Sequence, residues 1–322
     1  MPTYEEVLEK DYARQIKFNH VEEYHKLGYE GKGITILNAE SLSDHCKMTT
    51  KVLNDYAPEA TVITSNISGR TSNDKVIETT VTINGEKIDF EKAIDKYNIK
   101  IVTHSYSGSI SDARLNYFKG IQKHKGIIFF CSAGNDGDEG ITGMETKYNT
   151  AIAVGAVYIT KNNEIKLENY SSRGEELDFV SFLARGVGTS AASPALAAMT
   201  ALLLQRYGDF NQEQCIEILK SLCIDLGSGG KDNNFGYGLP ILPLTDKIEI
   251  IDKLKGADEM QFKDVTKGEW YYDEIEKAVN EGLVKGYDDG NFKPNNSVTR
   301  AEQAVIANRI LEKVRLEISK QK

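Results

Sequence analysis

Over roughly the first 200 residues, short apolar stretches alternate with stretches whose apolar residues recur at helical spacing. The apolar stretches are continuous and do not alternate with polar residues, which is typical of strands buried on both faces. They lie at 33–37, 60–67, 100–108, 126–135 and 150–157. We therefore predict an α/β fold in which helices cover both faces of a parallel sheet. The pair Asn84-Gly85 predicts a two-residue hairpin.

Polar segments follow three of the predicted strands, and a fourth polar segment opens a long helix. The four segments are NAESLSDH (38–45), HSYSG (104–108), SAGNDG (132–137) and GVGTSAASPALAAM (186–199). We predict that the helix begins near Ser190 and that Pro194 lies in its first turn, where a missing N–H group is tolerated. Functional loops gather at the carboxyl ends of parallel strands, so we expect these segments to meet.

Ser190 has two interpretations at this position. A serine at the start of a helix most often caps it. It becomes a nucleophile when a base, a group that orients the base and oxyanion donors are in reach. His45, after the first strand, is a candidate base, and Asn135, in a Gly-Asn turn, is a candidate donor. Both residues are also compatible with structural roles, as a partly buried histidine and as a left-handed turn residue.

Composition and charge exclude several kinds of partner. The chain has 322 residues, 27% of them charged and 40% hydrophobic, as in an ordinary globular protein. Its net charge of -9 argues against binding to nucleic acids or to anionic membranes. We find no secretory signal pattern and no segment apolar enough to span a bilayer, so we expect a cytoplasmic chain on synthesis. The four cysteines form no CxxC pair and are predicted to be small buried hydrophobic residues.

Several ordered motifs resemble those of the subtilisin-like serine proteases. GTSAASPALAA is similar to the nucleophile motif of that family, and FFCSAGNDG to its oxyanion segment. AIAVGAV and NYSSRGEELDFVSF match the strands between them, in order and in register. GYEGKGITIL, DHCKMTTKVLNDYAPEA and FGYGLPIL are similar to the first catalytic strand, the helix of the catalytic histidine and the closing segment. The resemblance covers residues 20–245 and implies a subtilisin-like fold.

The resemblance also implies roles for individual residues. Ser190 becomes the nucleophile, His45 the general base and Asn135 the oxyanion donor. Two segments become the walls that align and recognise a peptide, and their residues are Ser105, Tyr106, Ser107, Gly108, Ser132, Ala133 and Gly134.

The sequence departs from the family pattern around the catalytic histidine. Asn38 stands where the family has its catalytic Asp, and Cys46 stands where a Gly ordinarily follows the histidine. The short segment between Asn38 and His45 lacks a region that binds calcium in many relatives, so we expect no metal site there. Glu40 lies two positions after Asn38, and such residues of an extended chain point to the same side. We therefore predict that Glu40 orients His45, the alternative being a solvated surface glutamate.

The C-terminal stretch has the character of a separate small helical module. Residues 262–311 are predicted to form a helix, a Gly-rich loop and a helix, with Ala278, Val279 and Leu283 as the apolar stripe of the first helix. Thr299 and Glu302 form a capping box for the second helix. FKDV, WYYDEI, GYDDGNFKPN and TRAE resemble one S-layer homology repeat, a family that anchors proteins to cell-wall polysaccharide.

For that repeat the resemblance makes Trp270 and Arg300 candidate glycan contacts. A core position for Trp270 and a surface position for Arg300 are the alternative. The repeat is expected to bind wall polymer, to dock on the protease domain or to trimerise.

Taken together, the resemblances imply a serine endopeptidase that acts on a peptide or protein substrate through an acyl-enzyme, without a cofactor. One alternative is an inactive pseudoprotease that binds or scaffolds at the cell wall. Another is a wall-associated adhesion or assembly protein, which would reach the wall after its release. The predicted organisation is an N-terminal helical segment at 1–30, a catalytic domain at 31–245, a linker at 246–260 and the repeat at 261–322.

Overall fold

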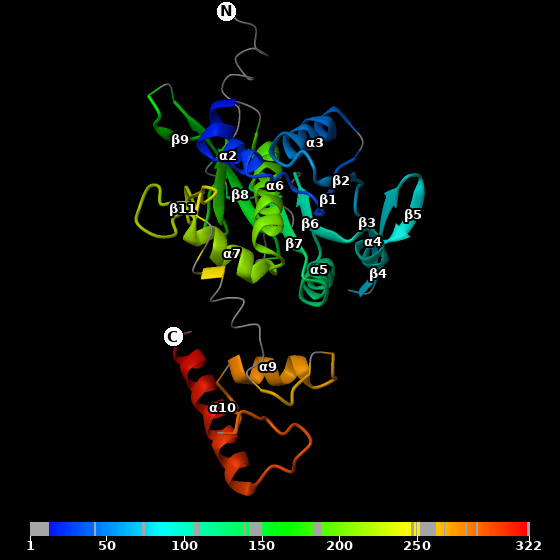
Figure 1. Cartoon of the computed structure of the whole chain (residues 1–322), viewed down its shortest axis with the longest axis vertical. Coiled ribbons are helices and arrows are strands. Elements are labelled where there is room, and N and C mark those ends of the chain that lie inside the picture. Colours follow the sequence, from blue (N-terminus) through cyan, green and yellow to red (C-terminus); the bar gives the residue numbers. More distant parts are fainter. Residues whose placement is uncertain are drawn as a thin grey trace, which may run out of the picture. The chain divides into compact units, whose positions relative to one another are not determined.

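The computed structural model describes residues 13–320 except 42, 73–74, 106–109, 138–139, 142–149, 161, 183–187, 246–247, 249, 252–261, 267, 281 and 288. Two compact units make up the chain, Met1–Ile251 and Asp252–Lys322. Figure 1 shows the helices and strands of both units.

A seven-stranded sheet forms the centre of the first unit. Its strand order is β10-β8-β7-β6-β1-β2, with every pair along this path parallel, and β9 pairs with β8 in the antiparallel sense. The strands are β1 (Thr35–Asn38), β2 (Thr61–Thr64), β6 (Ile99–His104), β7 (Ile128–Ser132), β8 (Ile152–Ile159), β9 (Ile165–Leu167) and β10 (Phe179–Phe182). The predicted parallel sheet is confirmed. Strands β1, β6 and β7 are neighbours in it, so their carboxyl ends lie at the same edge of the sheet.

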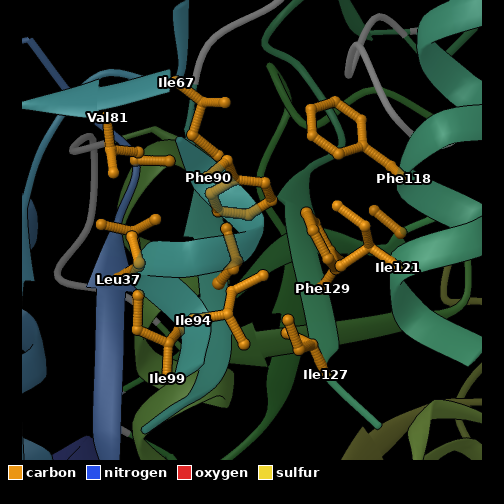
Figure 2. Packing of buried hydrophobic residues seen from close by; sticks show 14 of the residues in the cluster. Leu37, Ile67, Val81, Phe90, Ile94, Ile99, Phe118, Ile121, Ile127 and Phe129 are labelled. Atoms are coloured by element: carbon orange, nitrogen blue, oxygen red, sulfur yellow. The ribbon is translucent and has the colours of Figure 1, made fainter. Parts of the chain in front are cut away.

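Helices cover this sheet and bury its apolar side chains. They are α2 (Val21–Lys26), α3 (Asp44–Tyr56), α4 (Phe90–Tyr97), α5 (Asp112–Lys125), α6 (Thr189–Tyr207) and α7 (Gln212–Ser221). Figure 2 shows one core cluster, in which Phe90 of α4 and Phe118 of α5 meet Phe129 of β7. The rings of Phe90 and Phe118 lie edge to face with centroids 5.9 Å apart. Helix α6 packs on β6, β7 and β8 and is buried from Thr189 to Leu204.

A second, antiparallel sheet lies between β2 and α4 in the chain. It consists of β3 (Ser68–Ser72), β4 (Lys75–Ile83) and β5 (Glu86–Asp89). Asn84 and Gly85 have φ angles of 53° and 81° at the turn between β4 and β5, so the predicted hairpin is confirmed. Strand β3 was not predicted because its sequence, SGRTS, is polar, and residues 68–71 are exposed.

The N-terminal and C-terminal parts of the first unit are in contact. A short antiparallel pair, β11 (Cys223–Ile224) and β12 (Leu239–Pro240), follows α7. Val21 and Tyr24 of α2 are fully buried, and His20 Nδ1 lies 2.8 Å from the Leu242 carbonyl oxygen. The predicted N-terminal helical segment therefore packs into the first unit over its described residues.

The second unit has a small core of its own. It contains α9 (Tyr272–Asn280) and α10 (Arg300–Lys320), and Val265, Tyr272 and Ile275 are its buried apolar residues. The predicted stripe is partly wrong, because α9 ends before Leu283. Gly282, with a φ of +70°, turns the chain there, and the Leu283 N–H group donates to the Ala278 carbonyl at 2.8 Å.

The capping box of α10 is confirmed. The Thr299 N–H group donates to Glu302 Oε2 at 2.7 Å, and the Glu302 N–H group donates to Thr299 Oγ1 at 3.2 Å. These two bonds satisfy N–H groups that the first turn of a helix leaves without partners.

Deletion of residues 260–322 is expected to leave a folded first unit, because each unit buries its own core. Circular dichroism and thermal unfolding of the truncated chain check this, with an unfolding midpoint within about 4 °C of the full chain. Aggregation of the truncated chain, or strong binding of a dye that reports exposed apolar surface, would show that the first unit needs the second.

Candidate active site

Ser190 is the second residue of α6 and does not cap it. The N-cap is Gly188, whose φ of 93° is in the region that favours glycine, and no side chain caps the helix there. The interpretation of Ser190 as a helix cap is therefore wrong. Its side chain is 7% exposed, and its hydroxyl donates to the Ser105 carbonyl oxygen at 3.2 Å.

Pro194 is the sixth residue of α6, so its predicted place in the first turn is also wrong. Proline has no N–H group, so it cannot donate to the Ser190 carbonyl four residues earlier. The hydroxyl of Ser105 donates to that carbonyl instead, at 2.9 Å. Ser105 and Ser190 thus exchange two hydrogen bonds between the end of β6 and the start of α6.

Glu40, two residues after β1, and His45, at the start of α3, are in contact. His45 is the second residue of α3, and its Nδ1 lies 3.2 Å from Glu40 Oε2. The Glu40 side chain is 4% exposed, whereas that of His45 is 40% exposed. The Ser105 N–H group donates to the other carboxylate oxygen, Oε1, at 3.1 Å. A buried carboxylate with a partner on each oxygen has a fixed orientation, so Glu40 is not a solvated surface glutamate.

Asn38, the last residue of β1, is directed toward α3. Its Nδ2 donates to Thr49 Oγ1 at 2.9 Å and to Thr50 Oγ1 at 3.0 Å. The side chain is fully buried, and its Oδ1 has no hydrogen-bond partner within the described part of the chain. The structure therefore places a carboxylate beside His45, but from Glu40 and not from position 38.

Asn135 follows β7 and is exposed. Its Oδ1 accepts hydrogen bonds from the Thr189 N–H group at 2.9 Å and from Thr189 Oγ1 at 3.1 Å. These two bonds fix the orientation of the amide, and its Nδ2 has no acceptor among the hydrogen bonds of the described residues. A Cβ atom at Gly188 would lie 3.3 Å from that Nδ2, so glycine leaves room for the amide.

Sequence reasoning missed Thr189 and the two threonines that hold Asn38. Thr189 belongs to the GTS motif, but the sequence gives no sign of what its hydroxyl contacts. That hydroxyl bonds the Gly134 backbone, at 3.2 Å to the N–H group and at 3.1 Å to the carbonyl. A carboxamide at position 38 followed by a Thr-Thr pair on the next helix was the available signal for the second contact.

Of the predicted peptide-binding residues, Tyr106, Ser107 and Gly108 lie outside the described residues. Ser105 lies between Glu40 and Ser190 and is hydrogen-bonded to both. The other segment is held inside the fold: Ser132, Ala133 and Gly134 are buried, and the N–H group of Ala133 donates to the Val154 carbonyl at 2.9 Å.

Three of the four cysteines are buried. Cys46, Cys131 and Cys215 are buried, as predicted, but Cys223 is only half-buried. Burial raises the pKa of the Cys215 thiol, and it raises the pKa of the Cys223 thiol to about 12. Both thiols are therefore protonated at neutral pH and are poor nucleophiles.

In the second unit, Trp270 and Arg300 are both on the surface. Trp270 is 85% exposed, so its interpretation as a core residue is wrong. Its ring lies against Tyr271 at a centroid distance of 5.5 Å. Arg300 is the exposed first residue of α10.

The described ranges lack two features, a cluster of metal ligands and a membrane-spanning helix. Within those ranges, no group of three or more His, Cys, Asp or Glu side chains is arranged to hold a metal ion. None of the helices in the described part of the chain combines the length and the apolar character needed to cross a membrane.

Two family models match the chain. The subtilase family matches residues 35–238, and the S-layer homology domain matches residues 261–304. Minor extracellular protease Epr of Bacillus subtilis (strain 168) is 31% identical over 182 residues, which are 53% of this chain and 26% of Epr. Cell surface glycoprotein 1 of Acetivibrio thermocellus is 40% identical over 73 residues, 20% of this chain and 3% of that protein.

The fold is also shared with solved structures. A lanthipeptide protease superposes with a TM-score of 0.51 and 17% identity, over 70% of this chain and 92% of that one. The chain spans about a quarter of the length of Epr, so Epr resembles it in part only. The subtilase match covers well over half of the 322 residues, in the unit that holds Ser190, His45 and Asn135. The chain therefore belongs to the subtilase family and carries an S-layer homology domain after its subtilase domain.

Proposed function

We propose that the protein is a serine endopeptidase that cleaves peptide bonds through an acyl-enzyme. The observation that carries this proposal is the buried Glu40 carboxylate, 3.2 Å from His45 Nδ1. A carboxylate at that nitrogen holds the imidazole in the tautomer that leaves Nε2 free to accept a proton. It also stabilises the imidazolium that forms in the transition state.

Ser190 is the proposed nucleophile. Its Oγ attacks the peptide carbonyl carbon while His45 Nε2 takes the hydroxyl proton. For this the hydroxyl must exchange its present acceptor, the Ser105 carbonyl, for the imidazole. His45 then gives the proton to the leaving amine, and a water activated by His45 hydrolyses the acyl-enzyme.

Asn135 and the Ser190 N–H group are the proposed oxyanion donors. The Asn135 amide is held by Thr189 through Oδ1, so its Nδ2 is available to the oxygen that becomes negative. Loss of one such donor typically lowers kcat by about 10²–10³.

Burst kinetics with an activated ester, and labelling with a fluorophosphonate, test this proposal. The expected result is a burst of one product equivalent per chain and a single adduct on Ser190. A chain that gives neither a burst nor an adduct, although it is folded, would instead be the pseudoprotease of the alternative interpretation.

We also propose that the S-layer homology domain binds cell-wall polysaccharide and thereby holds the protein at the cell surface. The support is the exposed Trp270, since an indole face that is not needed by the core can pack on a sugar ring. Arg300 adds a planar guanidinium that pairs with a carboxylate of an anionic polymer.

Trp270→Ala is expected to weaken binding to purified wall polysaccharide by about tenfold or more, because large exposed aromatic side chains dominate such contacts. Co-sedimentation of the full chain with the polymer measures the loss. Val305→Ala, which trims another exposed apolar side chain of the same unit, is the matched control. Equal binding by the Trp270 variant and by the wild type would remove Trp270 from the proposed surface.

A further inference from the structure

We infer that Ser105 is a positioning residue that holds Glu40 and Ser190 in a fixed relative position, and that its hydroxyl does so in place of the i+4 donor that Pro194 cannot supply to the Ser190 carbonyl. The inference rests on the proposed peptidase function for its kinetic consequences. It assigns Ser105 a role beyond the lining of a peptide-binding strand.

Three hydrogen bonds of Ser105 carry the inference. Its N–H group donates to Glu40 Oε1 at 3.1 Å, its hydroxyl donates to the Ser190 carbonyl at 2.9 Å, and its carbonyl accepts from the Ser190 hydroxyl at 3.2 Å. One buried residue, 4% exposed, thus contacts the carboxylate through its backbone and the nucleophile through both backbone and side chain.

The bond from the Ser105 hydroxyl has a specific cause. Within α6 the Ser190 carbonyl would ordinarily accept from the N–H group of residue 194, and proline has none. A buried carbonyl without a donor is costly, so an outside hydroxyl is needed at this point of the helix. That hydroxyl comes from the residue that also fixes Glu40. The start of α6 is consequently aligned with the carboxylate that orients His45.

Removal of the Ser105 hydroxyl is expected to disturb the start of α6 and therefore the position of the nucleophile. In Ser105→Ala the Ser190 carbonyl loses its donor, and we expect kcat to fall by about tenfold to a hundredfold. KM is expected to change by less than about threefold, because the backbone groups of residue 105 remain in place.

Pro194→Ala provides the decisive second variant. Alanine restores an N–H group four residues after Ser190, so the helix can satisfy the carbonyl without Ser105. In that background Ser105→Ala should lower kcat only slightly. The kcat of the double variant, Ser105→Ala with Pro194→Ala, is expected to lie within about threefold of that of Pro194→Ala alone. Ser105→Thr, which keeps the hydroxyl, is expected to retain more activity than Ser105→Ala.

Ser193→Ala is the matched control. Its hydroxyl is also buried and bonds Thr103 Oγ1 at 3.0 Å, again between β6 and α6, and none of the hydrogen bonds described joins that hydroxyl to Glu40 or to Ser190. We expect a lower unfolding temperature and a kcat within about threefold of the wild type.

Full-length wild type, the three single alanine variants, the double variant and Ser105→Thr are compared by steady-state kinetics and by thermal unfolding. Recovery of kcat in the double variant supports the inference. Full activity in Ser105→Ala, or a double variant as slow as Ser105→Ala, overturns it while the wild type remains active. An inactive, unlabelled wild type would refute the proposed peptidase function. The thermal unfolding of the same variants then decides the inference, since additive losses would contradict coupling between Ser105 and Pro194.

Discussion

Ser190→Ala is expected to lower kcat by about 10⁶, because loss of the nucleophile of a serine peptidase typically costs that much. The remaining rate comes from binding and from the oxyanion donors, which act without the nucleophile. Steady-state hydrolysis of a peptide substrate at high enzyme concentration measures the loss, and the absence of a burst identifies the missing acyl-enzyme step. A variant with wild-type turnover would remove Ser190 from the mechanism.

The same substitution is expected to leave the fold intact. Since Ser190 is not the N-cap of α6, the alanine removes no cap, and among the described residues it removes the one side-chain hydrogen bond to the Ser105 carbonyl. The free energy of unfolding should fall by about 1 kcal/mol. Chemical denaturation followed by circular dichroism is the control that separates lost chemistry from lost structure.

Glu40→Gln is expected to lower kcat by about 10⁴, the typical effect of replacing the carboxylate of a serine triad by its amide. Glutamine fits the buried site, and its carbonyl can still accept from the Ser105 N–H group. Its NH₂ group then faces His45 Nδ1 and favours the wrong tautomer of the imidazole. Peptide hydrolysis measures the effect, with Glu59→Gln, an exposed glutamate outside the site, as the control.

Position 38 gives a second check on this assignment. Asn38→Asp would introduce the carboxylate that the family ordinarily has there, but Asn38 is bound to Thr49 and Thr50 of α3 and not to His45. We therefore expect Asn38→Asp to leave Glu40→Gln slow in the double variant. If the double variant regained wild-type activity, position 38 would be the orienting site and Glu40 would not.

Much of the fold followed from the sequence because its signals are local and strong. Continuous apolar strands require cover on both faces, so they predicted the parallel sheet. The Asn84-Gly85 pair predicted the hairpin, and both residues have the left-handed φ angles that such a turn needs. The pairing of Glu40 with His45 was predicted from the family resemblance together with the two-residue spacing from Asn38, and the hydrogen bond between them agrees with that prediction. The catalytic roles of both residues stay predictions until they are measured.

Other features depend on tertiary contacts that no local pattern reveals. The sequence places Pro194 in a first turn, yet it is the sixth residue of α6, and the Ser105 hydroxyl, which follows β6, donates to the carbonyl that residue 194 would ordinarily bond. The direction of Asn38 is set by two threonines on α3. Trp270 lies on the surface, whereas Tyr272, two positions later, lies in the core of the second unit.

The rate of fluorophosphonate labelling at Ser190, mapped by peptide mass spectrometry in wild type and in Glu40→Gln, tests the central claim most directly. The claim is that a buried glutamate, and not the residue at position 38, activates the serine through His45. It predicts one adduct on Ser190 of the wild type, formed about 10⁴ times more slowly in Glu40→Gln. No adduct in the folded wild type, or equal labelling rates in the two proteins, would contradict it.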